Sequence, residues 1–200
     1  MTVLSDSQII RYLKNKQIIV HPILDREQIS GARIGLRLDN RFFVFRYQKF
    51  PLCDPVEMAE RKLSGRDLGD FINIPYGENI YIHPGEFVIA EIFERISIPR
   101  TLVGNLDGRV SLARLGIVVH AAAAGINPGF SGRLACQISN MGKIPVALYP
   151  LMIIASLSFQ TVEGEVSIPD SLRHSDEITS TLIRDKEIQN KTLVQMKGKL

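Results

Sequence analysis

Two arginines and a serine fall within six residues near the middle of the chain, in the run GRVSLAR at 108–114. Arg109 and Arg114 carry the guanidinium groups, and Ser111 supplies a hydroxyl between them. Arg offers planar, bidentate donors that match phosphate oxygens, so this group suits a polyanionic ligand. On spacing alone, a surface turn with two solvated arginines is the commoner explanation of such a cluster.

The segments around this cluster carry strand and turn signals. The pairs Asp107-Gly108 and Asn127-Pro128-Gly129 are typical of turns. Between and after them, the apolar runs 115–119 and 134–138 indicate two buried strands. Further short apolar runs, separated by Gly and Pro, continue to residue 159. Such a pattern predicts an all-β sandwich or barrel.

Outside the β pattern, the sequence predicts a few helices. Ser5 and Gln8 form a capping box that begins a helix ending near Asn15. Residues 48–76 are the least regular part, with a short helix at 55–63, and we expect them to be an insertion packed on the outside of the domain. The boundary falls at residue 160: residues 1–160 form the β domain, and residues 161–200 form a polar C-terminal tail, a lid or a short helix.

Composition and charge bound the class of protein. A chain of 200 residues with 45% hydrophobic residues can bury one substantial core, so a single main domain is expected. A net charge of +3 gives no basis for nucleic-acid binding. The first residues show no signal-peptide pattern, and the longest apolar stretch, 144–159, is interrupted by Pro145 and Pro150, so we expect a cytoplasmic protein that does not span a membrane. The two cysteines, Cys53 and Cys136, have no metal-type spacing, and no zinc-deaminase signature is present, so no metal site is expected.

The central stretch GRVSLARLGIVVHAAAAGINPGFSG resembles the core signature of the dCTP deaminases, in the wider superfamily of dCTP deaminases and dUTPases. That pattern runs Gly-Arg-Ser-Ser-Leu-Ala-Arg-Leu-Gly, then Val-His, then Ile-Asp-Pro-Gly-Phe and a Gly. Flanking segments are also similar to the family. They include the opening LSDSQIIRYLKNKQIIVHP, the stretch ARIGLRLDNRFFVF, which looks like a strand pair of the family, and the His-Pro-Gly-Glu-Phe turn at 83–87. The resemblance extends over residues 1–160.

The resemblance implies a distorted jelly-roll β-barrel of the dUTPase-like type, assembled as a homotrimer with active sites shared between subunits. The ligand it implies is a deoxyribonucleoside triphosphate, namely dCTP, dUTP or dTTP, with Mg²⁺ bound to the triphosphate and no tightly bound cofactor. The positions that it assigns to nucleotide binding are Arg109, Val110, Ser111, Arg114, Gly125, Asn127, Ala135 and Gln137.

Four of these positions depart from the family pattern. The catalytic Glu of the family corresponds to Gln137, and a carboxamide cannot exchange protons as a carboxylate does. The second Ser of the phosphate motif is Val110, the Arg before the Ile-Asp-Pro-Gly turn is Gly125, and the Asp of that turn is Asn127. The pattern keeps the phosphate contacts while it removes the groups that transfer protons.

Three hypotheses follow from this pattern. The first is a nucleotide-binding homologue with lost or impaired deaminase activity, which is a pseudoenzyme with a hydrolase fold. The second is a working, zinc-independent dCTP deaminase whose base has moved, for example to Glu163 or Glu165. The third is a structural or interaction trimer with a vestigial site.

Overall fold

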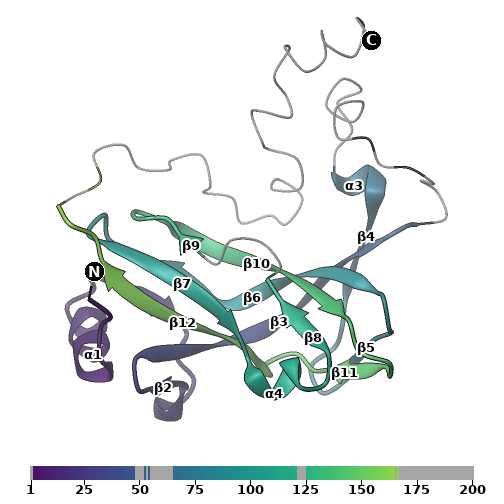
Figure 1. Ribbon diagram of the computed structural model, residues 1–200, viewed down its shortest axis with the longest axis horizontal. Helices are drawn as coiled ribbons and strands as arrows, with labels where there is room; N and C mark the ends of the chain where they lie inside the picture. Colours follow the sequence, from purple (N-terminus) through teal and green to yellow (C-terminus); the bar gives the residue numbers. More distant parts are fainter. Residues whose placement is uncertain are drawn as a thin grey trace, which may run out of the picture.

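The computed structural model describes residues 2–47, 52, 54, 65–120, 125–164 and 166. This part of the chain forms one curled sheet of ten strands and a separate sheet of two strands, with a few short helices (Figure 1). Every strand pair is antiparallel. The prediction of an all-β barrel-like domain is therefore confirmed.

The helices are α1 (Asp6–Lys14), the 3₁₀ helix η1 (Arg26–Gln28), α3 (Gly65–Leu68) and α4 (Val110–Ala113). The first six strands are β1 (Ile19–His21), β2 (Ile29–Ser30), β3 (Arg33–Phe45), β4 (Gly69–Asn73), β5 (Ile80–Ile82) and β6 (Phe87–Ser97). The others are β7 (Leu102–Gly108), β8 (Ile117–Val119), β9 (Gly125–Ile126), β10 (Ser131–Asn140), β11 (Val146–Leu148) and β12 (Ile153–Thr161). In the main sheet the strands lie in the order β8-β10-β6-β3-β12-β7-β9. In addition, β1 pairs with β6, and β2 and β4 pair with β3. The second sheet consists of β11 paired with β5.

Strand β3 links the two halves of the main sheet. Its first part pairs with β12, from Ile34–Leu157 to Arg37–Ile153, and its second part pairs with β6, from Leu38–Ile92 to Val44–Val88. Register shifts interrupt both ladders, which is how a long strand bends from one sheet face to another. The expected strand pair at 32–45 is therefore one continuous strand, because separate partners on either side hold it extended.

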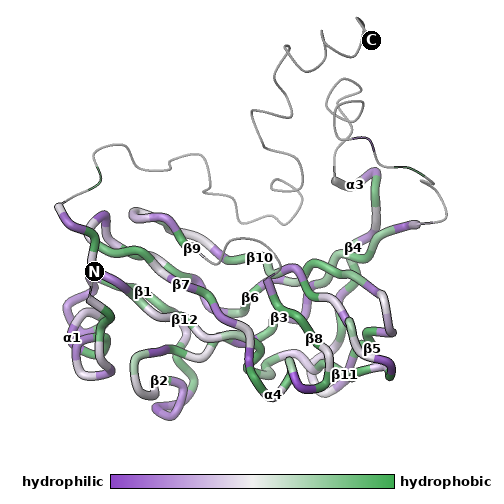
Figure 2. Tube along the Cα trace, viewed as in Figure 1, coloured by the Kyte–Doolittle hydropathy of each residue, from purple (hydrophilic) through white to green (hydrophobic). Residues whose placement is uncertain are grey.

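The core lies inside the curled sheet, where strands contribute every second side chain. On β6, Val88, Ala90 and Ile92 point inward and are almost completely buried. They meet large side chains from other strands, including Phe42 and Phe159, both fully buried. Figure 2 shows the hydrophobic stretches along the strands, whereas hydrophilic stretches gather on α1 and on the loop that carries β2. Burial of this apolar surface is the main stabilising term of the domain.

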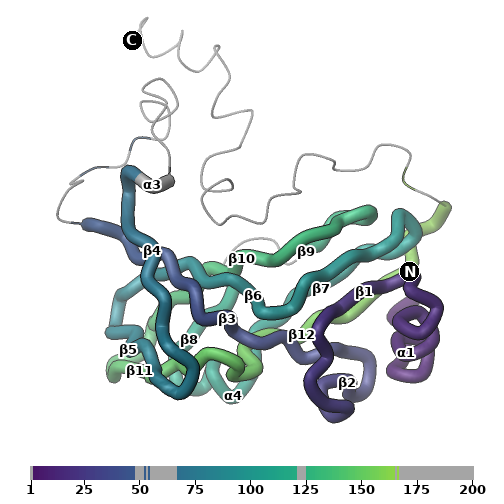
Figure 3. The backbone as a smooth tube through the Cα atoms, turned by 180° about the vertical axis from the view of Figure 1, so that it is seen from behind, coloured from purple at the N-terminus to yellow at the C-terminus, as the bar shows by residue number. Residues whose placement is uncertain are grey.

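Helix α1 begins as the sequence predicts. The backbone N–H of Gln8 donates to the Ser5 hydroxyl, and the Gln8 side chain accepts from the Ser5 backbone N–H at 2.9 Å. Ile9 is fully buried against the sheet, so the helix covers one end of the barrel next to β1 (Figure 3). The capping box and the apolar stripe together determine where this helix starts and which face it buries.

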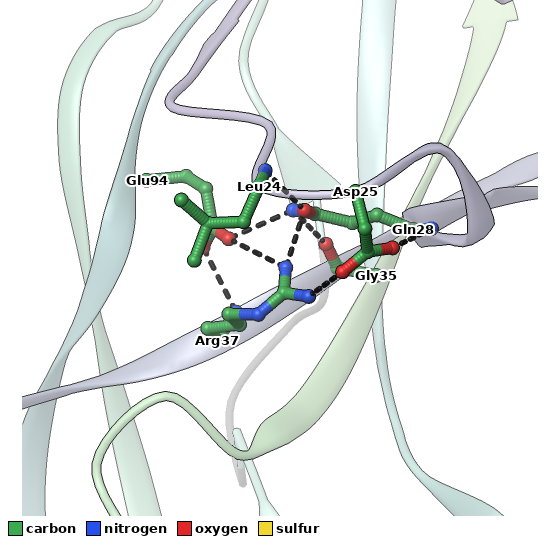
Figure 4. A network of polar contacts seen from close by, with 6 residues as sticks. All are labelled: Leu24, Asp25, Gln28, Gly35, Arg37 and Glu94. Atoms are coloured by element: carbon green, nitrogen blue, oxygen red, sulfur yellow. Dashed lines mark hydrogen bonds and ion pairs between the residues drawn. The ribbon is translucent and has the colours of Figure 1, made fainter.

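A buried polar network joins η1 to β3 and β6 (Figure 4). Glu94 is fully buried, and its carboxylate accepts hydrogen bonds from the Arg37 backbone N–H and from Gln28 Nε2, each at 2.8 Å. Gln28 also donates to the carbonyl oxygen of Gly35, and the Arg37 guanidinium contacts Asp25 and Gln28. Burial raises the pKa of Glu94, and the hydrogen bonds from Arg37 and Gln28 only partly offset that effect.

Two predicted segments differ from expectation or lie outside the described residues. Residues 69–73 are not an external insertion: they form β4, which pairs with the second part of β3. The predicted helix at 55–63 lies outside the described residues, as does the tail at 165 and 167–200.

Within the described ranges, no helix is long and apolar enough to span a membrane. No group of three or more His, Cys, Asp or Glu side chains in those ranges is arranged to hold a metal ion.

Candidate functional site

The phosphate-binding candidates lie on one exposed helical turn. Strand β7 continues through Gly108, and the Arg109 N–H then donates to the Ile154 carbonyl oxygen at 3.1 Å before α4 begins. The turn expected at 107–108 therefore comes later, because β12 pairs with Asp107 and Gly108 and keeps them extended. Inside α4, only Leu112 is buried, and it anchors the turn on the core.

This arrangement leaves the polar groups of the turn free to meet a ligand. Arg109, Ser111 and Arg114 are all exposed, and neither guanidinium has an ion-pair partner among the described residues. Val110 is exposed as well, with a relative accessibility of 66%. Two uncompensated cations on one short turn attract an anionic ligand, and guanidinium geometry favours phosphate oxygens.

The loop that contacts the turn after α4 is held by a buried asparagine, Asn140, that we did not single out from the sequence. The Asn140 side chain donates to the carbonyl oxygens of Ile82 and Ile144, at 2.7 and 2.8 Å, and accepts from the Gly142 N–H at 2.8 Å. The Met141 N–H donates to the Gly116 carbonyl oxygen at 2.8 Å. The Asn140 side chain thereby holds the loop after β10 against β5, and the Met141 N–H joins that loop to the segment after α4. In the sequence, the feature that could have identified Asn140 is its position directly before Met141-Gly142.

Gln137 lies on the outer face of β10. Cys136 and Ile138 on either side of it point into the core, so Gln137 and Ala135 share the opposite face. The carbonyl oxygen of Gln137 accepts the His120 backbone N–H at 2.7 Å, which ties β10 to the segment that leaves β8. The side-chain Oε1 of Gln137 is buried and has no hydrogen-bond partner within the described part of the chain. A buried acceptor of this kind is available to a ligand or a water molecule.

The structure brings some of the predicted residues together and keeps others apart. Strand β8, which follows α4, pairs with β10 at Val119–Ile138, so the α4 turn and Gln137 belong to the same end of the barrel. Asn127 lies at the other end, in a turn where the Phe130 N–H donates to the Asn127 carbonyl oxygen. Along β10, Ser131 next to that turn is six residues from Gln137, or about 20 Å of extended strand. One chain alone therefore does not place Asn127 beside Gln137.

Gly125 lies on the edge strand β9, directly opposite Asn105 of β7. It is exposed, and a Cβ added there would have no atom within 4 Å. Whatever ligand lies near this point meets backbone and open space rather than a side chain of residue 125. Residue 125 therefore supplies no positive charge to a ligand at this point.

A carboxylate close to this part of β10 is that of Glu91, which stands opposite Ala135 on β6. Its oxygens face two guanidiniums, those of Arg41 at 3.4 Å and Arg133 at 3.9 Å, and Arg133 also pairs with Asp39. Glu91 thus belongs to an ion-pair cluster beside the site.

Glu163, one of the two tail carboxylates considered as a replacement base, does not lie beside Gln137. Glu163 follows the end of β12, where the Val162 N–H donates to the Thr101 carbonyl oxygen, at the end of the barrel away from Gln137. Glu165 lies outside the described residues.

Comparisons with known proteins identify the family of this chain. The dCTP deaminase-like family model matches residues 3–162. A dCTP deaminase from Haemophilus influenzae strain PittEE is 39% identical over 194 residues, which cover 92% of this chain and 99% of the relative. The dUMP-forming dCTP deaminase of Dictyoglomus turgidum is 39% identical over 168 residues, which cover 84% of each chain.

A solved structure shows the same fold. The dCTP deaminase of Agrobacterium tumefaciens superposes with a TM-score of 0.62 at 17% sequence identity, and the match covers 80% of this chain and 48% of that one. The chain thus spans about half the length of the Agrobacterium chain. The predicted dUTPase-like fold is confirmed, and the match over most of the sequence shows that this chain belongs to the dCTP deaminase-like family.

Proposed function

We propose that the protein binds deoxyribonucleoside triphosphates and has lost or impaired dCTP deaminase activity. The observation that carries this proposal is the side chain of Gln137, whose buried Oε1 lacks a partner in the described residues at the position of the family's catalytic Glu. The amide can hold a water or contact a base, but it does not move a proton. Loss of a general acid–base group typically lowers a rate by about 10²–10⁴-fold.

The phosphate side of the site supports the binding half of the proposal. Arg109, Ser111 and Arg114 remain, all exposed on and around α4, and the two guanidiniums are uncompensated among the described residues. They would hold the triphosphate, with Mg²⁺ accompanying the ligand to neutralise part of its charge. The relatives are dCTP deaminases by name, so dCTP is the first ligand to test, with dUTP and dTTP as competitors.

Hydrolytic deamination needs a water that attacks the ring carbon bearing the amine and a group that shuttles protons to the ring and to the leaving ammonia. Glu91 is engaged by two guanidiniums, and Glu163 lies at the other end of the barrel. Neither is placed to take over that task within one chain. The proposal therefore favours binding without efficient turnover.

The separation of Asn127 from Gln137 supports assembly into a homotrimer, because a second subunit can bring an Asn127 turn to the Gln137 end of its neighbour. Light scattering at micromolar concentration should give the mass of three chains. A monomer would overturn this part of the proposal and would remove any shared site. A cytoplasmic location stays a prediction.

The proposal is tested by two measurements on the full chain. A thermal-shift screen with Mg²⁺ should show stabilisation by deoxyribonucleoside triphosphates, since a ligand that binds only the native state raises the melting temperature. Chromatography should show little or no conversion of dCTP to a uracil nucleotide, with the Haemophilus relative as positive control. Conversion at the rate of that relative would overturn the loss of activity. Absence of any nucleotide-dependent shift would overturn nucleotide binding and leave a structural trimer as the explanation.

A further inference from the structure

Asn105, in the middle of β7, has a buried polar group without a partner. Its side-chain Nδ2 is inaccessible to solvent and makes no hydrogen bond within the described part of the chain. Buried amide donors in native proteins are almost always satisfied, so an exception requires an explanation. Keeping such a donor unpaired costs free energy in the unliganded protein, which suggests that a ligand satisfies it.

The strand register shows which face Asn105 occupies. Its neighbour Gly104 faces the core, because a Cβ there would lie 3.1 Å from the Leu157 side chain and 3.2 Å from that of Ile126. Asn105 therefore faces the opposite side of the sheet. Its direct partners in the ladder are Ser158 on β12 and Gly125 on β9, so these three residues lie in one row across the outer face.

Open space lies across from Asn105, over Gly125. Directly opposite residues on antiparallel strands have their Cβ positions about 5 Å apart. Because Gly125 has no side chain and nothing lies within 4 Å of its Cβ position, a ligand atom can occupy the position across from the Asn105 side chain, and a turn of that side chain would bring its covered Nδ2 toward it. A donor beside such a space calls for an oxygen or nitrogen acceptor.

The same strand leads to the phosphate-binding turn. Arg109 is four residues beyond Asn105, about 13 Å along an extended chain. The acceptor that meets Asn105 is therefore a different part of the ligand from the phosphates that meet Arg109. In a nucleotide, the remaining acceptors are the oxygens and ring nitrogens of the base and the sugar.

We propose that Asn105 is a ligand-binding residue of this site, whose Nδ2 donates to an acceptor of the base or sugar in the space over Gly125. The inference rests on the proposed nucleotide-binding function and adds a residue that recognises the nucleoside moiety. It gives β7 two roles, with Asn105 contacting the nucleoside and Arg109, just after the strand, contacting the phosphates.

The test compares Asn105→Leu with wild type and with Asn73→Leu, an exposed asparagine at the end of β4. Two ligands are titrated by thermal shift and calorimetry: the best deoxyribonucleoside triphosphate from the screen, and inorganic tripolyphosphate. We expect Asn105→Leu to weaken nucleotide binding by roughly ten-fold or more, the loss of about one buried hydrogen bond. Tripolyphosphate affinity should be unchanged, and Asn73→Leu should behave as wild type with both ligands.

The unliganded protein gives a second, independent measurement. Because Asn105→Leu removes a buried unpaired donor, its melting temperature without ligand should equal or exceed that of wild type. Asn105→Ala serves as a second variant in case leucine does not fit the space. Unchanged nucleotide affinity in both variants, or equal losses for nucleotide and tripolyphosphate, would overturn this inference alone. A wild type that responds to no nucleotide would overturn the proposed function together with it.

Discussion

Gly116 and Gly142 meet backbone to backbone at the end of α4. A Cβ on Gly116 would lie 2.4 Å from the Gly142 nitrogen and 2.5 Å from its Cα, distances that side chains do not adopt. Gly116 also has a φ of 91°, in the left-handed region that favours glycine. This contact joins the turn that carries Arg114 to the loop after β10, so it positions the phosphate-binding residues relative to Gln137.

The first prediction concerns this contact. Gly116→Ala should lower the free energy of unfolding by at least about 2–3 kcal/mol, because backbone strain and a clash with backbone atoms add together. Gly77→Ala is the matched control, since Gly77 has a φ of 94° with nothing within 4 Å of its Cβ position. Its cost should be only the strain, about 1 kcal/mol. Equal losses for the two variants in urea unfolding would show that the close approach to Gly142 contributes nothing.

The second prediction concerns the phosphate-binding turn. If Arg109, Ser111 and Arg114 hold phosphates, a triphosphate should bind more tightly than its nucleoside. Arg109→Ala should remove one charge-assisted contact of about 1.5–3 kcal/mol, or roughly ten- to a hundred-fold in affinity. Arg11→Ala, on the exposed side of α1, is the control and should bind as wild type. Calorimetry that finds equal affinity for nucleoside and triphosphate, or no effect of Arg109→Ala, would assign these arginines a structural role only.

The third prediction asks whether the site is defective at one position or several. Gln137→Glu alone should not restore dCTP deamination. The Oε1 position is buried, and a carboxylate there would have its pKa raised by desolvation with few donors to stabilise the charge. Adding Gly125→Arg and Val110→Ser should recover more activity than the separate changes predict. The structure accepts both, because Gly125 faces open space and Val110 is exposed.

Formation of a uracil nucleotide, followed by chromatography, measures these variants. Gln160→Glu, on β12, introduces the same charge elsewhere and should leave activity at the wild-type level. Full recovery by Gln137→Glu alone would contradict the multi-position explanation. It would still support Gln137 as the principal defect.

The fourth prediction is a pH dependence that arises from Glu94. Because burial raises the folded-state pKa of this carboxyl above its unfolded value, its contribution to stability is fully present below the unfolded pKa of about 4.5. That contribution is lost as pH rises through the folded-state pKa. Glu94→Gln removes the titration and places an amide N–H₂ group among donors from Arg37 and Gln28, so it should destabilise the domain by about 1–3 kcal/mol.

Unfolding measured at several pH values between 4 and 7 tests this prediction. The stability advantage of wild type over Glu94→Gln should shrink as pH rises. Glu78→Gln, on an exposed turn, serves as the control. An advantage that grows with pH would show that the Arg37 guanidinium outweighs desolvation and lowers the pKa instead.

The sequence predicted several features that depend on residues close together in the chain. Ser5 and Gln8 determined the start of α1 because a capping box involves residues only three apart. The Asn127-Pro128-Gly129 signal predicted a turn, and Gly129 adopts a φ of 82° there. Short apolar runs separated by Gly and Pro predicted the β architecture. The motif around Arg109 and Gln137 was sufficient to identify the family.

Other features depended on contacts between segments far apart in the chain. Asp107-Gly108 is typical of a turn, yet pairing with β12 keeps it in a strand, because a ladder partner outweighs local preference. Residues 69–73 gave little signal, yet they pair with β3. Asn105 shows the same limit most clearly. Its burial, its missing partner and the open space opposite it arise only when β7, β9 and β12 lie side by side, and no local pattern encodes where three separate strands will meet.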